Sequence, residues 1–594
     1  MKFSTRHFTL AAMSALLFSG AASFAQMTDA KLQTKRALLQ RIMKEKFHPE
    51  HEEAEESNAA AAKTTGYDQR VSAAPNTTGE GEVSMAYNPN DSSELVLSYM
   101  QQSPSGALAF PIYYSANGGS SWTQSSFNSN AICTADFPGQ LAAGGGDPAF
   151  AWDKNGRLYF AWIYLTVNSS FDTGFFTLNW AYSDDKGHTW SVKPKHFVGR
   201  GVIDLATNNT LAMYDGITDR EWLAVDNSGG AHQGNVYCSF VCFPPASIPA
   251  YEGIKTLVPG IDTFGNAVPA YTGNTQFGNV EVDKNGTLHM SFADIDNSQV
   301  RHVASTDGGA SFGTSVVVSG ASVIFPAGPS YVFHNRENAA VNMAVDGRTG
   351  SGNNVHIVWS DFPGTTAISY YSHSTDSGHT WSVPDTLNKR FGNNITLMPT
   401  VAAEGNNVTV SVTAINGADS SWYYQLNSTD NGATFGSLST TSALPTRYVG
   451  LVANVDSSPL FFGDYNRSVR AQCQTYATWS DGRSSSAKVY FARKNFCRLG
   501  VQEVTAVANG VKLTSVFPNP ASGQVNMKIE ADIAQPITTQ LYDMAGKKVA
   551  EQHYVLKAGQ QQITMPLQGI AKGVYVITLQ GNNGMIATRN VEVN

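Results

Sequence analysis

The chain has 594 residues, of which 42% are hydrophobic and only 14% are charged, and its formal net charge is −8. This length favours several domains or a large repeat array, and the 53 glycines suit an all-β protein rich in turns. The acidic balance, without any basic cluster that alternates with aromatic residues, excludes nucleic acid as the predicted partner.

The first 25 residues have the composition of a secretory signal peptide. Lys2 and Arg6 give the positive start, an apolar centre follows, and Ala25 ends a small-residue cleavage site. No later stretch is apolar and long enough to span a membrane, so we predict an exported chain with no membrane span. Residues 26–65 are charged and helix-prone, which predicts a helical or flexible leader.

An eight-residue phrase occurs five times in the middle of the chain. Its pattern is Ser-x-Asp-x-Gly-x-Ser/Thr-aromatic, as in Ser374 to Trp381, and each copy follows an apolar run. The Asp can accept hydrogen bonds from N–H groups about two residues further on, the Gly can adopt a positive φ, and the aromatic residue starts the return strand. We therefore predict structural β-hairpin turns at Asn117, Asp185, Asp307, Asp376 and Asp430.

A second phrase, an apolar strand followed by an acid and a turn, sets the period of the repeat. The aligned acids Asp153, Asp226, Asp283, Asp346 and Glu404 are 73, 57, 63 and 58 residues apart, which fits a unit of four strands. First strands near residues 83, 148, 221, 279, 340, 399 and 462 predict seven units. The last unit lacks a fourth strand, which residues 67–71 could supply to close a ring.

The five phrases resemble the Asp-box, or BNR repeat, of sialidase-like β-propellers. Four further phrases resemble the same group, namely Asp219 to Asp226, Gly463-Asp464-Tyr465, Trp479 to Arg483 and Val489 to Arg493. The resemblance implies a β-propeller over residues 66–500. We predict an all-β fold with seven blades, and the alternative is the six blades of true sialidases.

Residues 511–594 form a separate module of alternating strands and Gly-containing turns, which predicts a small C-terminal β-sandwich. Three motifs occur in order, at Val516 to Pro520, Leu541 to Val549 and Leu567 to Ile577. They resemble the type A C-terminal sorting domain of the type IX secretion system. The resemblance implies a Bacteroidota-type bacterium, the type IX secretion machinery as a partner, and a location outside the cell or on the outer-membrane surface.

Ligands of propellers bind where the inner strands and the loops between blades converge on one face. Converging arginines and carboxylates could hold an acidic sugar or a polar glycan, or could instead form salt bridges between blades. The candidate ligand-binding residues, which lie just before the predicted inner strands, are Asp147, Arg220, Glu221, Arg336, Glu337, Asp464, Tyr465 and Arg467.

The resemblance to sialidases does not extend to their catalytic residues. Such a sialidase uses three arginines, a Tyr nucleophile paired with a Glu, and an Asp, and its first arginine lies in an Arg-Ile-Pro phrase before the first box. This chain has no such phrase, and the catalytic residues are unknown. We therefore favour a secreted or cell-surface propeller that binds glycans or glycoproteins without established catalysis. The alternative is a glycoside hydrolase of the sialidase-like, exo-α-sialidase type.

The remaining signals concern a long segment, the cysteines and cofactors. Residues 243–274 are interpreted as an insertion whose aromatic residues either stack on sugars or pack as a lid over the tunnel. The five cysteines predict mostly buried thiols, with Cys473 and Cys497 as one plausible pair. No zinc-type spacing occurs, so we predict no cofactor and no metal site, although the Asp-rich turns would allow a structural Ca²⁺.

Overall fold

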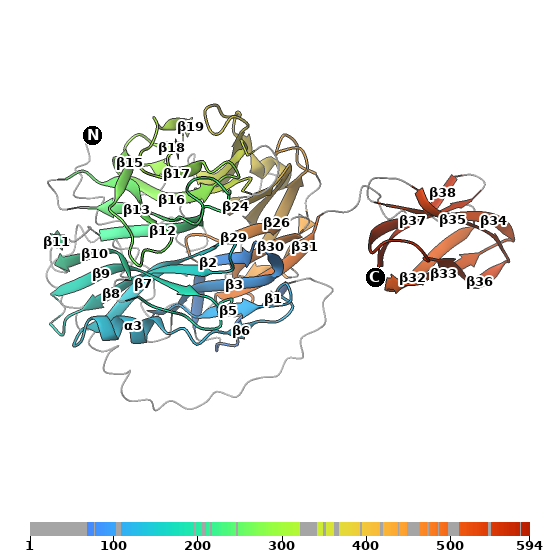
Figure 1. Cartoon of the computed structure of the whole chain (residues 1–594), viewed down its shortest axis with the longest axis horizontal. Coiled ribbons are helices and arrows are strands. Elements are labelled where there is room, and N and C mark those ends of the chain that lie inside the picture. The colour runs from blue at the N-terminus through green and yellow to red at the C-terminus, as the bar shows by residue number, and fades with distance from the viewer. Residues whose placement is uncertain are drawn as a thin grey trace. The chain divides into compact units, whose positions relative to one another are not determined.

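The computed structural model of the chain describes most residues after position 67 (Figure 1). The signal peptide and the leader predicted over residues 26–65 lie outside this part. The chain divides into two units, residues 1–494 and 495–594. The described ranges are 68–75, 78–102, 108–170, 172–193, 196–204, 209–213, 217–244, 248–320, 341–347, 352–361, 367–391, 395–415, 420–436, 439–442, 444–447, 463–471, 474–484, 486–496, 510–543, 548–581 and 584–594.

Within these ranges, the first unit forms seven antiparallel sheets, each of which begins at an inner strand and continues outward. The first sheet contains β2 (Gly79–Asn88), β3 (Asp91–Gln102), β4 (Leu108–Ala109), β5 (Ile112–Ser115) and β6 (Thr123–Gln124). The second contains β7 (Leu141–Trp152), β8 (Leu158–Val167), β9 (Thr173–Ser183), β10 (Phe197–Asp204) and β11 (Asn209–Met213). The third contains β12 (Ile217–Val225), β13 (Val236–Phe243), β14 (Tyr251–Leu257) and β15 (Val268–Thr272). A short helix that the sequence did not predict, α3 (Ser129–Asp136), follows β6.

The other four sheets follow the same plan. They contain β16 (Thr275–Val282), β17 (Leu288–Asp294), β18 (Gln299–Ser305) and β19 (Val316–Gly320); β20 (Asn342–Val345), β21 (Val355–Asp361), β22 (Ile368–Ser374) and β23 (Asp385–Thr386); β24 (Thr396–Glu404), β25 (Asn407–Ile415), β26 (Ser420–Ser428), β27 (Ser439–Thr440) and β28 (Thr446–Arg447); and β29 (Arg467–Ala471), β30 (Gln474–Asp481), β31 (Lys488–Asn495) and β1 (Asp68–Arg70).

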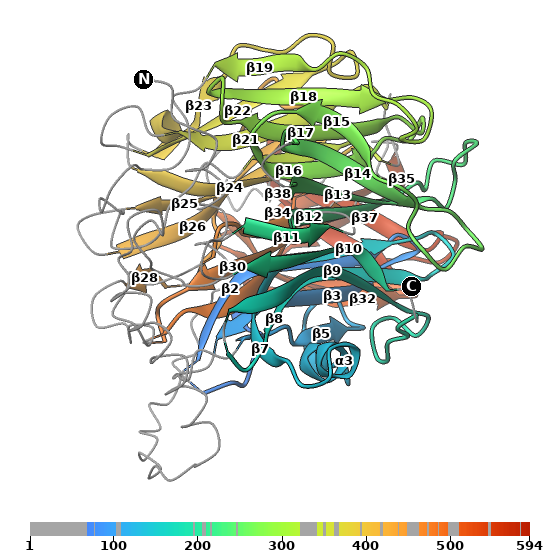
Figure 2. The same ribbon diagram turned by 90° about the vertical axis from the view of Figure 1, so that its left-hand side faces the viewer.

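The inner strands contact one another in a cycle. In chain order, each of β2, β7, β12, β16, β20, β24 and β29 contacts the next, and β29 returns to β2. Figure 2 shows β2, β12, β16 and β24 toward the middle of this unit, with β19, β23 and β28 toward its rim. Sheets arranged radially around an axis define a β-propeller, so the predicted all-β propeller fold is confirmed.

The N-terminal strand completes the last sheet, as the sequence predicted. Asp68 lies opposite Ala492 of β31, so this sheet draws its strands from both ends of the unit. The buried ammonium group of Lys488 donates hydrogen bonds to Pro75 O and Thr78 O, both at 2.7 Å. Because this pairing covers the edge of β31, the ring is held together by segments more than 400 residues apart.

Each Asp-box forms the turn between the third and fourth strands of its sheet. Ser374 Oγ donates to Asp376 Oδ1 at 2.7 Å and accepts the Gly378 N–H at 2.9 Å, where Gly378 has a φ of 87°. The Asp376 carboxylate accepts the Thr380 N–H and hydroxyl at 2.8 and 2.6 Å. The Asp376 carboxylate therefore accepts hydrogen bonds from a residue four positions further along the chain, whereas the sequence predicted a donor about two positions further. The half-buried Trp381 packs edge-on against His302 of the preceding sheet, so the turn also joins neighbouring blades.

Residues 243–274 are not an insertion, and the prediction for this segment is wrong. They contain β14 and β15, the last two strands of the β12 sheet. No Asp-box marks the turn between them, which hid their place in the repeat. Their aromatic rings pack against neighbouring strands: Tyr251 on Phe240, Phe264 on Trp180, and Tyr271 on Phe292.

Three of the five cysteines fall within the described ranges, and all three are buried free thiols. Cys133 lies in α3, and Cys238 and Cys242 lie in β13. Burial raises the pKa of the Cys238 thiol well above its usual range, which makes this side chain an unreactive core group. The predicted pair Cys473 and Cys497 lies outside the described residues.

The C-terminal unit is built from seven strands in the order β35-β34-β37-β38-β32-β33-β36. Strand β32 pairs with β33 from Val511 to Phe517 and again at Ser522, and between these stretches its Ala521 pairs with β38. The motif Phe517 to Pro520 is thus the corner at which one strand passes between two parts of the sheet, where proline's missing N–H is tolerated. The strands are β32 (Val511–Ser522), β33 (Gln524–Ala531), β34 (Gln535–Tyr542), β35 (Lys548–Leu556), β36 (Gly559–Pro566), β37 (Gly573–Gly581) and β38 (Gly584–Val593).

Candidate functional site at the propeller axis

Five of the inner strands carry the same β-bulge near their start. At each bulge, two residues of the inner strand face one residue of the second strand, and the first of the two has a positive φ. A bulge redirects side chains, and a positive φ is costly for residues other than glycine. The residues in this conformation are Glu82 (φ 53°), Asp147 (φ 54°), Arg220 (φ 58°), Phe277 (φ 61°) and Met398 (φ 47°).

Two of these bulges bring opposite charges together. Arg220 Nη1 lies 3.1 Å from Asp147 Oδ1, and the same oxygen accepts the Tyr465 hydroxyl at 3.1 Å. The Arg220 guanidinium lies over the rings of Tyr465 and Phe277, 4.5 and 4.6 Å from their centroids. The Arg220 and Asp147 side chains are only 9% and 6% exposed. The predicted residues Asp147, Arg220 and Tyr465 therefore form one buried network across three sheets.

Four further carboxylates act on this network. Glu82 exerts an electrostatic effect on both Arg220 and Tyr465, and Asp464 exerts one on Arg220. Asp219 accepts the backbone N–H of Arg220 at 3.1 Å. Glu221 is the second residue of the β12 bulge and is 2% exposed. We call the following seven residues the axial cluster: Glu82, Asp147, Asp219, Arg220, Glu221, Asp464 and Tyr465.

Burial dominates the electrostatics of the axial cluster. It raises the pKa values of Asp219 and Glu221 well above their usual range, and the negative charge of Asp147 raises them further. It also raises the pKa of Asp147, although Arg220 acts in the opposite direction. Burial alone would lower the pKa of Arg220, but Asp147 and its neighbours outweigh this effect and raise it. The arrangement thus holds a permanent cation among carboxyl groups that retain protons readily.

A second contact extends the site. Arg467 Nη2 lies 3.5 Å from Glu281 Oε1, and the Arg467 guanidinium lies 4.5 Å from the centroid of the Trp222 ring. Trp222, Glu281 and Arg467 come from β12, β16 and β29, so Arg467 reaches residues of sheets that are not its neighbours in the cycle. An aromatic ring and an ion pair therefore lie beside the axial cluster.

Six of the eight predicted candidates are described, and five of them belong to the axial cluster, with Arg467 beside it. Arg336 and Glu337 lie outside the described residues. The sequence prediction missed Glu82, Asp219 and Glu281. The spacing of the repeat offered a usable signal for Glu82. Each bulge residue with a positive φ lies six residues before the residue that ends or directly follows its strand, as Asp147 lies before Asp153 and Glu82 before Asn88.

The described part of the chain contains neither a metal-binding cluster nor a helix that could span a membrane. There, no group of three or more His, Cys, Asp or Glu is arranged to hold a metal ion. No described helix is sufficiently long and apolar to cross a membrane. The expectation of a structural Ca²⁺ stays a prediction.

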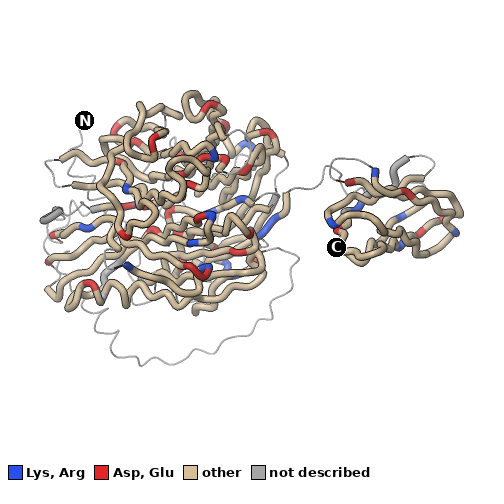
Figure 3. The backbone as a smooth tube through the Cα atoms, in the orientation of Figure 1, with Lys and Arg blue, Asp and Glu red and all other residues tan. Residues whose placement is uncertain are grey.

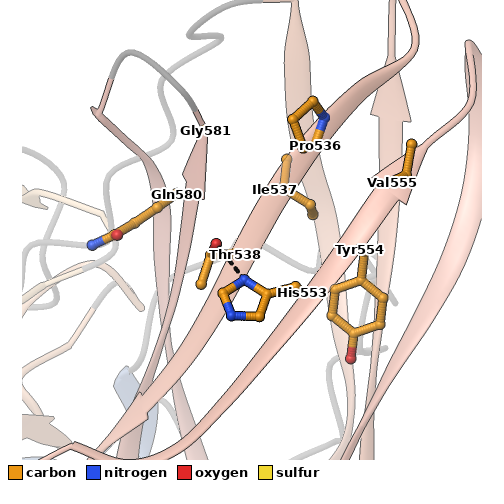
Figure 4. Close-up of a pocket in the computed structure, with 8 residues that line it drawn as sticks. All are labelled: Pro536, Ile537, Thr538, His553, Tyr554, Val555, Gln580 and Gly581. Atoms are coloured by element: carbon orange, nitrogen blue, oxygen red, sulfur yellow. Dashed lines mark hydrogen bonds between the residues drawn. The ribbon is translucent and has the colours of Figure 1, made fainter.

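A separate hollow of about 260 Å³ lies on the C-terminal unit (Figure 4). It is formed by β34, β35 and the end of β37, and two of its lining groups, His553 Nδ1 and the Thr538 hydroxyl, share a hydrogen bond of 3.0 Å. The residues that line it are Pro536, Ile537, Thr538, His553, Tyr554, Val555, Gln580 and Gly581. None of them belongs to the predicted ligand site.

The C-terminal unit has a recognised identity. Residues 515–593 match the family described as the secretion system C-terminal sorting domain. The chain therefore carries a type IX sorting domain, which directs it to the cell surface or the extracellular space. No curated protein matches the chain.

Several solved structures resemble the chain at low identity. A protein of unknown function from Dyadobacter fermentans DSM 18053 is 13% identical, with a TM-score of 0.40 over 61% of this chain and 98% of that chain. The Penicillium chrysogenum α-L-arabinanase is 13% identical, with a TM-score of 0.37 over 73% and 98%. The Ruminococcus gnavus intramolecular trans-sialidase is 14% identical, with a TM-score of 0.35 over 71% and 96%. Such identities transfer no activity.

Proposed function

We propose that the protein is an exported β-propeller that binds a glycan or glycoprotein at the axial cluster and its Arg467–Trp222 edge, without hydrolysing it. The observation that carries this proposal is the buried Asp147–Arg220–Tyr465 network. Its charges are paired within the protein, which suits a rigid binding surface. The neighbouring Trp222 ring and the Arg467–Glu281 pair supply the apolar face and the polar groups that sugars require.

Hydrolysis needs a different arrangement. A glycosidase places two carboxyl groups on either side of the scissile bond, so both must reach the substrate. Asp147 is 4% exposed and its nearest hydrogen-bond partners are Arg220 and Tyr465. Asp147 is therefore held by its protein partners, which favours a binding role for this site over a catalytic one.

A sialidase-like glycoside hydrolase is the second candidate, and one observation favours it. Burial raises the pKa of Asp147 and Glu221, and a raised pKa is what a general acid requires at neutral pH. Tyr465 lies beside Asp147, so a phenol and an acid are in contact.

Screening of the secreted protein on a glycan array, followed by calorimetry and product analysis with the glycans that bind, separates the two candidates. We expect binding without release of sugar. Tyr465→Phe removes the hydrogen bond to Asp147, so it should weaken binding severalfold. Tyr182→Phe, in β9, the third strand of its sheet, is the matched control and should leave binding unchanged. Release of sugar that disappears in Tyr465→Phe would establish the hydrolase instead.

A further inference from the structure

We infer that the axial cluster recognises a positively charged amine on its sugar ligand and rejects acidic sugars. This inference rests on the proposed function, because it names the ligand class of the same site. It departs from the expectation that converging arginines hold an acidic sugar. Three features lead to it: the charge balance of the cluster, the unpartnered carboxylate of Glu221, and the cluster's contact with solvent.

The charge balance of the axial cluster is negative. It contains five carboxyl groups and one guanidinium, so its formal charge is −4 when every group is ionised. Both arginines at the site are already engaged, Arg220 with Asp147 and Arg467 with Glu281. Along the rest of the described backbone, charges of both signs are interspersed (Figure 3). An acidic sugar would add negative charge beside these carboxylates and meet no unengaged guanidinium among the described residues, whereas an ammonium group would offset the excess.

Glu221 supplies the acceptor for such an ammonium group. It is 2% exposed, and neither of its carboxylate oxygens has a hydrogen-bond partner. The N–H of its own backbone and the charge of Arg220 favour its ionised form, but burial and the charges of Asp147 and Asp219 outweigh them and raise its pKa. A buried carboxylate without partners is costly, and an ammonium group offers three donors. The titratable groups that face Glu221 are Asp147 of β7, Asp219 and Arg220 of β12, Cys238 of β13, and Tyr465 ahead of β29.

The edge of the cluster meets solvent. Asp464 and Tyr465 are each 7% exposed and Arg220 is 9% exposed, while Asp147 and Glu221 lie deeper. Because so little of the cluster is exposed, the inferred contact is made by a small charged group of the ligand and not by a whole sugar ring. The ring would then rest outside, next to Trp222 and Arg467, with its amine directed at the carboxylates.

The test compares three oligosaccharides of similar length with the full secreted protein: a glucosamine oligomer, its N-acetylated counterpart and a sialylated oligosaccharide. Calorimetry at pH 6 should give at least tenfold tighter binding for the glucosamine oligomer than for the N-acetylated one, and no binding of the sialylated one. Binding should also release protons, because the amine displaces them from the carboxyl groups, and the heat should therefore depend on the ionisation enthalpy of the buffer. A simple alkylamine should compete with the glucosamine oligomer.

Glu221→Gln keeps the shape of the side chain and removes its charge, so it should fold, and it should lose most of the tenfold amine preference and part of the proton release. Asp219→Asn is a second variant with the same expectation. Asp184→Asn, which removes a surface carboxylate paired with Arg157, is the matched control. It should change neither the preference for the amine nor the proton release. A merely structural role for Glu221 would alter the melting temperature without altering proton release.

The outcomes separate the inference from the proposed function. Equal binding of the glucosamine oligomer and its N-acetylated counterpart, or tighter binding of the sialylated oligosaccharide, overturns the inference and leaves glycan binding in place. Binding of the alkylamine without binding of any glycan overturns the proposed function and retains the cation preference. Binding of none of the probes overturns both.

Discussion

Two sets of carboxylates in the propeller have opposite environments. The Asp-box carboxylates lie at exposed turns and accept several hydrogen bonds; those from Ser311 lower the pKa of Asp307 to about 2. The axial carboxylates lie in the interior, where burial raises the pKa of Asp219 and Glu221 well above the usual range. The number of donors and the access of water, and not the residue type, decide which proton affinity a carboxyl group has.

The comparison also shows how repetition relates to function. The boxes are repeated because these blades need the same turn. Four of the five keep a Ser-to-Asp hydrogen bond, and in the first box Ser115 donates to Asn117 instead. The bulges are repeated in backbone conformation while their side chains differ from blade to blade, from Glu82 to Met398. A constant backbone with varied side chains is how one scaffold can present a specific site.

The largest expected effect is that of Arg220→Met in the axial cluster. Removing the guanidinium leaves Asp147 buried without its charge partner, which should cost about 3–5 kcal/mol of unfolding free energy. The loss should be greater at pH 8 than at pH 5, because the carboxyl groups can take up protons at the lower pH. Denaturant unfolding at both pH values measures it.

The matched control for this prediction is Arg157→Met. Arg157 pairs with Asp184 at 2.6 Å, but the two side chains are 41% and 59% exposed, so the cost should stay below about 1 kcal/mol at either pH. Similar small losses for both variants would contradict the view that the axial pair differs from surface pairs.

The second prediction concerns Glu252, a buried acid of β14 beside the β16 bulge. Its Oε2 accepts the Thr275 hydroxyl at 3.0 Å, and burial raises its pKa from 4.5 to about 8. Between these values the folded state binds more protons than the unfolded state, so stability should fall as pH rises from about 4.5 to 8. The slope for one proton is at most about 1.4 kcal/mol per pH unit.

Glu252→Gln should flatten this part of the profile, as measured by unfolding at half-unit pH intervals. Because the variant has no carboxyl group to lose a proton, its advantage over the wild type should grow toward pH 8. Parallel profiles would show that Glu252 does not hold its proton in the folded protein.

A smaller effect is expected at the boxes. Asp376→Ala removes the acceptor of the Thr380 N–H and hydroxyl and should cost about 1–2 kcal/mol, with ligand binding per folded molecule unchanged. Hydrogen bonds from Thr380 and Ser374 outweigh partial burial and lower the pKa of Asp376 to about 2. The contribution of the Asp376 carboxylate to the free energy of unfolding should therefore be present above about pH 4 and disappear as the pH falls toward 2.

Asp376→Asn tests the same turn more gently. Asn117 occupies this position in the first box, where its Oδ1 accepts the Ser121 N–H at 3.0 Å. The Asn variant should accordingly lose less than the Ala variant. A folded Asp376→Ala protein that had lost ligand binding would contradict the division between structural and axial carboxylates.

The sequence predicted the repeat well because its signals are local. The turn at Ser374 to Trp381 and the acid at the end of each inner strand recur at readable spacing, and pairing of β1 with β31 followed from one missing strand. Strands β14 and β15 were not recognised in the sequence because no Asp-box separates them. Glu82 and Asp219 were missed although each has a local signal: Glu82 lies six residues before Asn88, and Asp219 directly precedes Arg220. The sequence does not record that Glu82 of β2 and Asp147 of β7 act on Arg220 of β12, because this depends on how three sheets meet around an axis.

The smallest expected effect on the propeller is that of removing residues 511–594. Both sets of carboxylates lie in the unit of residues 1–494, and β1 pairs with β31 within the propeller. The truncated protein should therefore keep its melting temperature and the same pH profile of stability. Without the sorting domain it should remain in the periplasm, while intact mass should show that the full chain, once secreted, ends before about residue 515. Failure of the truncated chain to fold, or secreted protein that retains Asn594, would make the C-terminal unit a working partner of the propeller.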